Sequence, residues 1–253
     1  MKIELFKNRL FFLSCAATVA LLAGCGNSSG GGGMKCDPTM PDLTYDPVIN
    51  PADFQNATGD PLPIDNPLWP LSPGMKTVFE SPTETDDVTV TSDTRVIMGV
   101  TTVAVLDQVS EDGDITEDTT DYYAQDKDGN VWYFGEDTME LDNGMVTSTA
   151  GSWIGGVDGA KPGIVMYAVQ PPAGEPYRQE YLVCEAEDMA EVVNTNVHVD
   201  VPYGSFDNCL ETHEFTPLEP KLDEHKFYCA GVGVVLEVDE VTGDRTELTS
   251  VTP

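Results

Sequence analysis

Two predicted strands near the carboxyl-terminal end of the chain, separated by a proline-containing linker, hold the side chains best suited to metal binding or cross-linking. If these strands form a hairpin in which Cys209 faces Cys229, then His213 faces His225 on the same pair of strands. Glu211 lies between the two pairs, and residues two apart share one face of a strand. The hairpin would therefore gather sulfur, imidazole and carboxylate groups on one side.

Two interpretations of these histidines are open. Two histidines on adjacent strands bind Zn²⁺ or Cu²⁺ when a third ligand converges on them. On this hypothesis His213, His225 and Glu211 form a metal site, and His198 lies about one strand away. The spacing matches no named metal motif, so solvated side chains or ring-stacked neighbours are the alternative. Reduced Cys209 and Cys229 could complete a Cys₂His₂ site, although an oxidising compartment disfavours this.

The cysteine content predicts disulfides. The cysteines beyond residue 25 are Cys36, Cys184, Cys209 and Cys229. Outside the cytoplasm an even set of this kind predicts disulfide bonds, and three pairings are possible. Directly opposed strand residues place their Cβ atoms near the distance that a disulfide needs, which favours Cys209–Cys229. There is no C-x-x-C sequence, so a thioredoxin-like redox role has no support.

Enzyme signatures are scarce, and we predict no catalytic activity and no cofactor. The chain contains no G-x-S-x-G, no H-E-x-x-H and no P-loop. Acidic turns at residues 112–114, 126–130 and 185–188 resemble fragments of Ca²⁺-binding loops, because oxygen ligands at alternate positions suit that ion. The other interpretation of these turns is that they are polar hairpin tips.

The charge of the chain excludes one class of partner. There are 44 acidic residues against 12 lysines and arginines, which gives a formal net charge of −32. Such a surface repels phosphate backbones, so nucleic-acid binding is excluded. Solubility, a salty habitat, Ca²⁺ binding and docking of a basic protein partner all remain compatible with the charge.

The amino-terminal residues have the pattern of a secretory signal peptide. Basic residues precede an apolar run over residues 10–22, and small residues follow it. Residues 22–25 (LAGC) resemble the lipobox of bacterial lipoproteins. That resemblance implies cleavage before Cys25 and lipidation of its thiol and new amino group. Gly26 in the next position resembles the pattern that permits export to an outer membrane. The alternatives are an ordinary signal peptide and an uncleaved anchor.

The rest of the chain divides by composition. Residues 25–36 form a Gly/Ser tether after the signal peptide at 1–24, and residues 37–73 are rich in proline, with Trp69 and Leu71 expected to dock onto the domain. Residues 74–253 alternate β-rich runs with Asp/Gly/Asn turns. We predict an all-β domain, either a single curved antiparallel sheet or a partly open barrel. Predicted strands cover residues 76–80, 87–92, 95–109, 115–125, 130–136, 145–152, 178–183, 192–201, 204–215, 225–230 and 232–241.

Several long strings resemble an uncharacterised family of secreted bacterial proteins. They occupy residues 121–137, 151–164, 177–192, 201–209 and 215–233. The resemblance implies a mostly β, extracytoplasmic domain and carries over no activity. The last ~40 residues are also similar, more weakly, to curved-sheet lipoproteins of the lipid-carrier type.

These observations predict an envelope-anchored lipoprotein that acts as a non-catalytic binding or structural module. Its membrane partner would be reached through the lipid on Cys25. An apolar ligand in the concavity of the sheet is one possibility, and acidic protein–protein contacts or metal binding are the alternatives. The aromatic residues of the strands either fill the interior or line a cavity, and the volume of that interior would discriminate between these possibilities.

Overall fold

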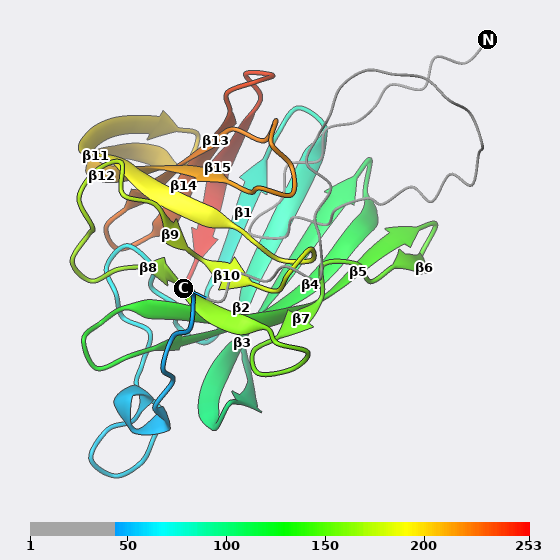
Figure 1. Ribbon diagram of the computed structural model, residues 1–253. Helices are drawn as coiled ribbons and strands as arrows, with labels where there is room; N and C mark the ends of the chain where they lie inside the picture. Colours follow the sequence, from blue (N-terminus) through cyan, green and yellow to red (C-terminus); the bar gives the residue numbers. More distant parts are fainter. Residues whose placement is uncertain (1–43) are drawn as a thin grey trace, which may run out of the picture.

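The computed structural model describes residues 44–253 as one antiparallel sheet of fifteen strands that nearly closes into a barrel (Figure 1). The predicted signal peptide, the lipidation site Cys25, the tether and Cys36 lie outside the described residues. The strands are β1 Lys76–Glu80, β2 Glu84–Ile97, β3 Val100–Glu111, β4 Asp114–Gln125, β5 Val131–Asp142, β6 Met145–Ser148, β7 Trp153–Ile154, β8 Lys161–Met166, β9 Tyr177–Arg178, β10 Glu180–Tyr181, β11 Met189–Val201, β12 Gly204–Phe215, β13 Glu224–Cys229, β14 Gly233–Asp239 and β15 Arg245–Thr252. The prediction of an all-β, partly open barrel is confirmed.

The barrel is built from two meanders that join through their first and last strands. Strands β1 to β5 pair in sequence, strands β11 to β15 pair in sequence, and β1 pairs with β15. At the other side of the barrel, β9 pairs with β11 while β10 pairs with β8. The short segment that contains β9 and β10 therefore lies along both free edges, and it brings them together at a seam that is not fully hydrogen-bonded.

One glycine makes this closure possible. Gly163 of β8 lies so close to the neighbouring chain that a Cβ atom there would come within 2.4 Å of the carbonyl carbon of Gln179. Real Cβ atoms do not approach backbone so closely, so any side chain would push the seam apart. Gln179 is the residue between β9 and β10, so the glycine lies where the two edges meet.

Tight turns set the strand boundaries, and one of them corrects the sequence prediction. The predicted strand over residues 95–109 is wrong, because Met98 (φ 50°) and Gly99 (φ 83°) form a two-residue turn between β2 and β3. Two successive positive φ angles match the twist of a hairpin. Methionine is not a turn residue, which is why the pattern hid this boundary. Strands β7, β8 and β15 were also missed.

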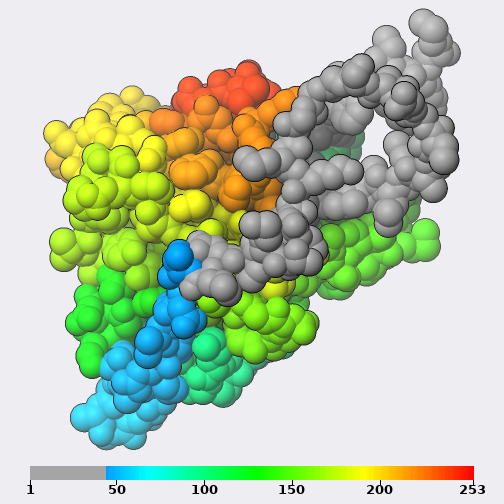
Figure 2. All heavy atoms as spheres, in the orientation of Figure 1, coloured from blue at the N-terminus to red at the C-terminus, as the bar shows by residue number. Residues whose placement is uncertain are grey.

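The described part of the proline-rich segment, residues 44–73, packs against the barrel. A 3₁₀ helix at Pro51–Phe54 places Phe54 against Phe134 on the outer face, with ring centroids 5.4 Å apart. Residues near position 50 form the blue ridge at the lower edge of the molecule in Figure 2. Further along, Trp69 and Leu71 pack against the interior cluster, as predicted.

Hydrogen bonds to one side chain hold this covering segment in place. The Oε1 atom of Gln125 accepts from the backbone N–H groups of Asp65 (3.0 Å) and Asn66 (2.8 Å), and its Nε2 donates to the Asp65 carboxylate (2.7 Å). These bonds anchor the segment to the end of β4. The side chain of Trp69, a few residues further along, packs inside the barrel. Its indole lies 5.7 Å from the ring of Tyr228 and 5.6 Å from that of Tyr123.

Candidate functional site

The interior of the barrel is acidic along much of its length. Buried positions alternate along the strands, so that Glu117, Thr119, Asp121 and Tyr123 of β4 all face inward. The same alternation on other strands buries further carboxyl groups. The buried acidic side chains on strands are Asp86, Asp107, Glu117, Asp121, Glu136, Glu180, Glu214, Glu224, Glu237 and Asp239. Among residues 44–253, Lys226 is the only buried lysine or arginine.

One half of this acidic interior contains a buried cation. Lys226 Nζ lies 3.1 Å from Glu214 Oε2 and 3.7 Å from Glu237 Oε2. The other oxygen of Glu214 accepts hydrogen bonds from Tyr228 (2.6 Å) and Thr212 (2.9 Å). Burial lowers the pKa of Lys226, but the surrounding glutamates outweigh burial and raise that pKa well above its usual value. Lys226 therefore stays charged and compensates Glu214, whereas neither oxygen of Glu237 has a hydrogen-bond partner and burial raises the pKa of Glu237 to about 7.

The half that contains Asp86 and Asp107 has no such balance. With both carboxyl groups ionised, neither oxygen of Asp86 has a hydrogen-bond donor. A proton shared with Asp107 supplies the missing bond. Burial raises the pKa of Asp86 to about 7 and that of Asp107 well above its usual range. The negative charge of Asp86 raises the pKa of Asp107 further, whereas a hydrogen bond with Asp107 partly lowers the pKa of Asp86. At neutral pH the two groups therefore behave as a pair that holds about one proton.

A cavity of about 70 Å³ lies beside this pair, under the covering segment. Its walls are mostly apolar, and Asp107 and Asp121 are its acidic members. Asp121 also accepts a hydrogen bond from Tyr133 (2.6 Å). The full lining is Trp69, Pro70, Leu71, Met75, Thr77, Phe79, Val88, Val90, Val105, Asp107, Asp121, Tyr123, Val232, Gly233 and Val234. Trp69 is one of these lining residues, and its indole N–H is buried without a hydrogen-bond partner, which is costly for a donor.

The predicted histidine hairpin forms in the predicted register. Strand β12 pairs with β13 so that His213 faces His225 and Glu211 faces Phe227. These side chains lie on the face opposite to the inward Thr212 and Lys226. The register was predictable because the cysteine pair and the proline-containing linker left few ways to align the strands.

The histidines pair with carboxylates instead of converging on one point. His225 Nδ1 lies 2.7 Å from Glu211, and the two ring nitrogens of His213 lie 3.2 Å from Glu191 and Asp223. Within residues 44–253, no group of three or more His, Cys, Asp or Glu side chains is arranged to hold a metal ion. The structure therefore offers no converging ligand set for the metal hypothesis at His213, His225 and Glu211.

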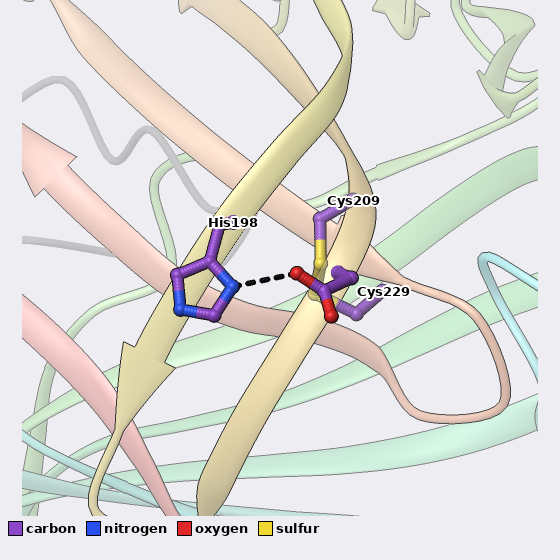
Figure 3. Close-up of a disulfide and its surroundings, with 4 residues drawn as sticks. His198, Cys209 and Cys229 are labelled. Carbon is purple, nitrogen blue, oxygen red and sulfur yellow. Dashed lines mark hydrogen bonds and ion pairs between the residues drawn. A yellow bond between two sulfur atoms is a disulfide. The ribbon is translucent and has the colours of Figure 1, made fainter.

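The predicted Cys209–Cys229 disulfide is present, with the two Cα atoms 4.5 Å apart (Figure 3). His198 of β11 lies near it and pairs with Asp207 (2.7 Å) and Asp200 (3.3 Å), both exposed. These carboxylates raise the pKa of His198. Cys184 is disulfide-bonded as well, whereas the other predicted participant, Cys36, lies outside the described residues.

The strongest of the predicted calcium-loop fragments is a hairpin tip. Asp126 accepts hydrogen bonds from the backbone N–H groups of Asp128 and Asn130 (both 2.9 Å), from the Asn130 amide (2.9 Å) and from the Trp132 indole (2.8 Å). Its two oxygens are thus used to close the turn between β4 and β5. The turn at residues 126–130 therefore matches the second interpretation given above, a polar hairpin tip.

The acidic interior and its cavity were not found by sequence reasoning. A signal existed, because Glu117 and Asp121 share one face of β4, and Glu237 and Asp239 lie at alternate positions of β14. It was hidden because outward positions of the same strands carry acids too, such as Asp118. With so many carboxyl groups in the chain, periodicity alone does not say which face is buried.

Comparison with known proteins gives similarity to two solved structures. A protein of Bacteroides fragilis, described as exported and as having a YmcC-like fold, is 14% identical with a TM-score of 0.42, over 74% of this chain and 99% of that one. A protein of Parabacteroides distasonis, described as a lipoprotein, is 10% identical with a TM-score of 0.39, over 73% of this chain and 98% of that one. No model of a known protein family matches the sequence, and no curated protein is similar to it.

In the described part of the chain, we find no helix with the length and apolar character needed to cross a membrane.

Proposed function

We propose that this protein is an envelope-anchored lipoprotein whose barrel is a non-catalytic binding module for a small ligand. The LAGC sequence and the preceding apolar run support the anchor. The cavity under Trp69 supports the binding function, and it is the observation that carries the proposal. It combines apolar walls with a few polar residues, and the indole N–H of Trp69, a lining residue, lacks a hydrogen-bond partner.

The volume of the cavity limits the size of the ligand. Sites for drug-sized molecules have volumes of roughly 300–1,000 Å³, whereas this cavity has about 70 Å³. Much of the remaining interior is filled by aromatic rings, such as Tyr133 and Tyr228, which are fully buried. A long acyl chain has no room there. The apolar ligand expected from the sequence is therefore reduced to a small molecule with an apolar part.

Native mass spectrometry of protein purified from its own host tests the binding function. We expect a small co-purifying molecule on the wild-type protein. Val90→Phe would fill the cavity and remove that molecule, because Val90 is buried in the cavity wall. Val96→Phe is the matched control, since Val96 lies on the same strand and is 67% exposed. If the wild-type and Val90→Phe proteins each showed only the mass of their own polypeptide, with no bound molecule, the result would count against the proposal.

Fractionation of cells tests the anchor separately. We expect the wild-type protein in the membrane fraction, with diacylglyceryl on the amino-terminal Cys25 by peptide mass spectrometry. Cys25→Ser should move the protein out of the membrane fraction or leave it unprocessed. Cys15→Ser, within the segment predicted to be removed, should change nothing. An unmodified Cys25 in mature protein would refute the anchor without affecting the cavity.

A further inference from the structure

We infer that the ligand of the cavity is a small organic cation, with an ammonium group that contacts Asp107 and Asp121 and an oxygen acceptor that faces Trp69. This inference rests on the proposed binding function and specifies its ligand class. It is built on three features of the cavity: an acidic wall without a counter-charge, aromatic rings around it and an unused hydrogen-bond donor.

Within residues 44–253, the acidic wall of the cavity has no positively charged partner. Asp107 and Asp121 line the cavity, and none of its lining residues is a lysine, arginine or histidine. Asp86 and Glu117 lie close enough to Asp107 to add their repulsion. Lys226, the buried base, has its ion pairs with Glu214 and Glu237. A buried carboxylate requires a paired charge or a proton, and an ammonium group supplies both a charge and N–H donors.

The aromatic residues favour the same kind of ligand. Trp69 and Tyr123 line the cavity with their ring centroids 5.6 Å apart. The faces of such rings attract cations, and tryptophan does so most strongly. A strongly hydrated metal ion would have to lose its water here without a set of converging ligands, whereas an alkylammonium group also uses the apolar walls.

The unpaired indole N–H of Trp69 adds a second requirement for the ligand, which is a hydrogen-bond acceptor. Trp69 is 8% exposed and its Nε1 atom has no hydrogen-bond partner. A ligand that satisfies it needs a hydroxyl, ether or carbonyl oxygen a short distance from the ammonium group. Given the volume of the cavity, such a ligand has the size of a short amino alcohol.

Isothermal titration calorimetry with three matched probes tests this inference. The probes are ethanolamine, propylamine and propan-1-ol, which carry an ammonium and a hydroxyl group, an ammonium group alone and a hydroxyl group alone. We expect affinity to fall in that order, with propan-1-ol at least about tenfold weaker than ethanolamine, because a charged hydrogen bond is lost. Ethanolamine should also release protons, because it replaces the proton of the Asp86–Asp107 pair; titrations in buffers of different ionisation enthalpy measure this release.

Single substitutions test which residues contact each group of the ligand. Asp107→Asn should weaken ethanolamine about tenfold or more and leave propan-1-ol unchanged, whereas Asp118→Asn, an outward acid that accepts from Gln108, should leave both unchanged. Trp69→Phe keeps a ring but removes the donor, so it should abolish the preference for ethanolamine over propylamine. Thermal melts of each variant confirm folding.

Two results would overturn the inference. Equal affinity for propan-1-ol and ethanolamine would show that the cavity binds small molecules without using its acids, so the proposed function would survive. Absence of binding by all three probes, together with a ligand-free native mass, would remove both the inference and the function.

Discussion

The two halves of the acidic interior differ in how their best-placed carboxyl groups, Glu214 and Asp86, are compensated. Glu214 receives an ion pair from Lys226 and hydrogen bonds from Tyr228 and Thr212. Asp86 receives no donor other than a proton shared with Asp107. Glu214 therefore has both its charge and its hydrogen bonds satisfied within the barrel. The Asp86–Asp107 pair has an unmet demand for positive charge beside an open volume, which is the property of a binding site.

Removing the buried cation is the strongest test of this contrast. Lys226→Met leaves Glu214 and Glu237 without their counter-charge, and we expect a loss of about 3–5 kcal/mol in the free energy of unfolding, measured in urea. Lys76→Met is the control, because Lys76 pairs with Asp87 at 2.8 Å but both are over a third exposed. We expect it to cost less than about 1 kcal/mol. Equal losses of stability in the two variants would show that the buried ion pairs matter no more than the exposed one.

The disulfide should have the next largest effect. Cys209 and Cys229 are separated by 20 residues, and a loop of that length gives a stabilisation of about 3 kcal/mol when it is cross-linked. The double variant Cys209→Ala/Cys229→Ala should lower the urea midpoint accordingly. Ethanolamine binding should weaken as well, because the bridge belongs to the same buried cluster as Phe79, which lines the cavity. Unchanged binding in a folded double variant would show that the cavity does not depend on this packing.

The Asp86–Asp107 pair should make stability depend on pH. The folded-state pKa of Asp86 is about 7, above its ordinary value of 3.8. Between these values the folded protein holds the extra proton, so stability falls as pH rises, by up to about 1.4 kcal/mol per pH unit for one proton. The part of this penalty that Asp86 contributes is absent below its ordinary pKa of 3.8 and develops as the pH rises to about 7.

Asp86→Asn should reduce this dependence between pH 5 and 8 and stabilise the protein at pH 8. The dependence that remains comes from Glu237 and Asp188, because burial raises the pKa of each to about 7 as well. Urea melts at several pH values measure both effects. Asp93→Asn, an exposed residue of the same strand, serves as the control. A wild-type protein with the same stability at pH 5 and pH 8 would show that the pair is not protonated as inferred.

The outer histidines should have the smallest effect. Glu211→Gln weakens a partly exposed contact with His225 and should cost less than about 1 kcal/mol. Adding Zn²⁺ or Cu²⁺ should leave the melting temperature of wild-type protein and of His213→Ala unchanged, because the rings do not converge with a third ligand. A metal-dependent rise that His213→Ala abolishes would restore the metal hypothesis.

The sequence by itself determined the local features of this protein. Asp112–Gly113 and Asn143–Gly144 both adopt the positive φ angles of hairpin turns, as their residue types predict. The Cys209–Cys229 pairing and the facing histidines followed from strand alternation and one linker. These features depend on interactions between residues close along the chain, where residue type restricts the backbone strongly.

Only the tertiary structure decided which acids are buried. Asp118 and Asp121 are both acidic residues of β4, and the sequence does not say that Asp121 faces the interior while Asp118 is paired with Gln108 at the surface. The seam at Gly163 and the entry of Trp69 into the barrel also depend on contacts between residues far apart in the chain. Burial of a carboxyl group is a property of the closed barrel, because the desolvation that shifts its pKa arises only when opposite strands exclude water from between them.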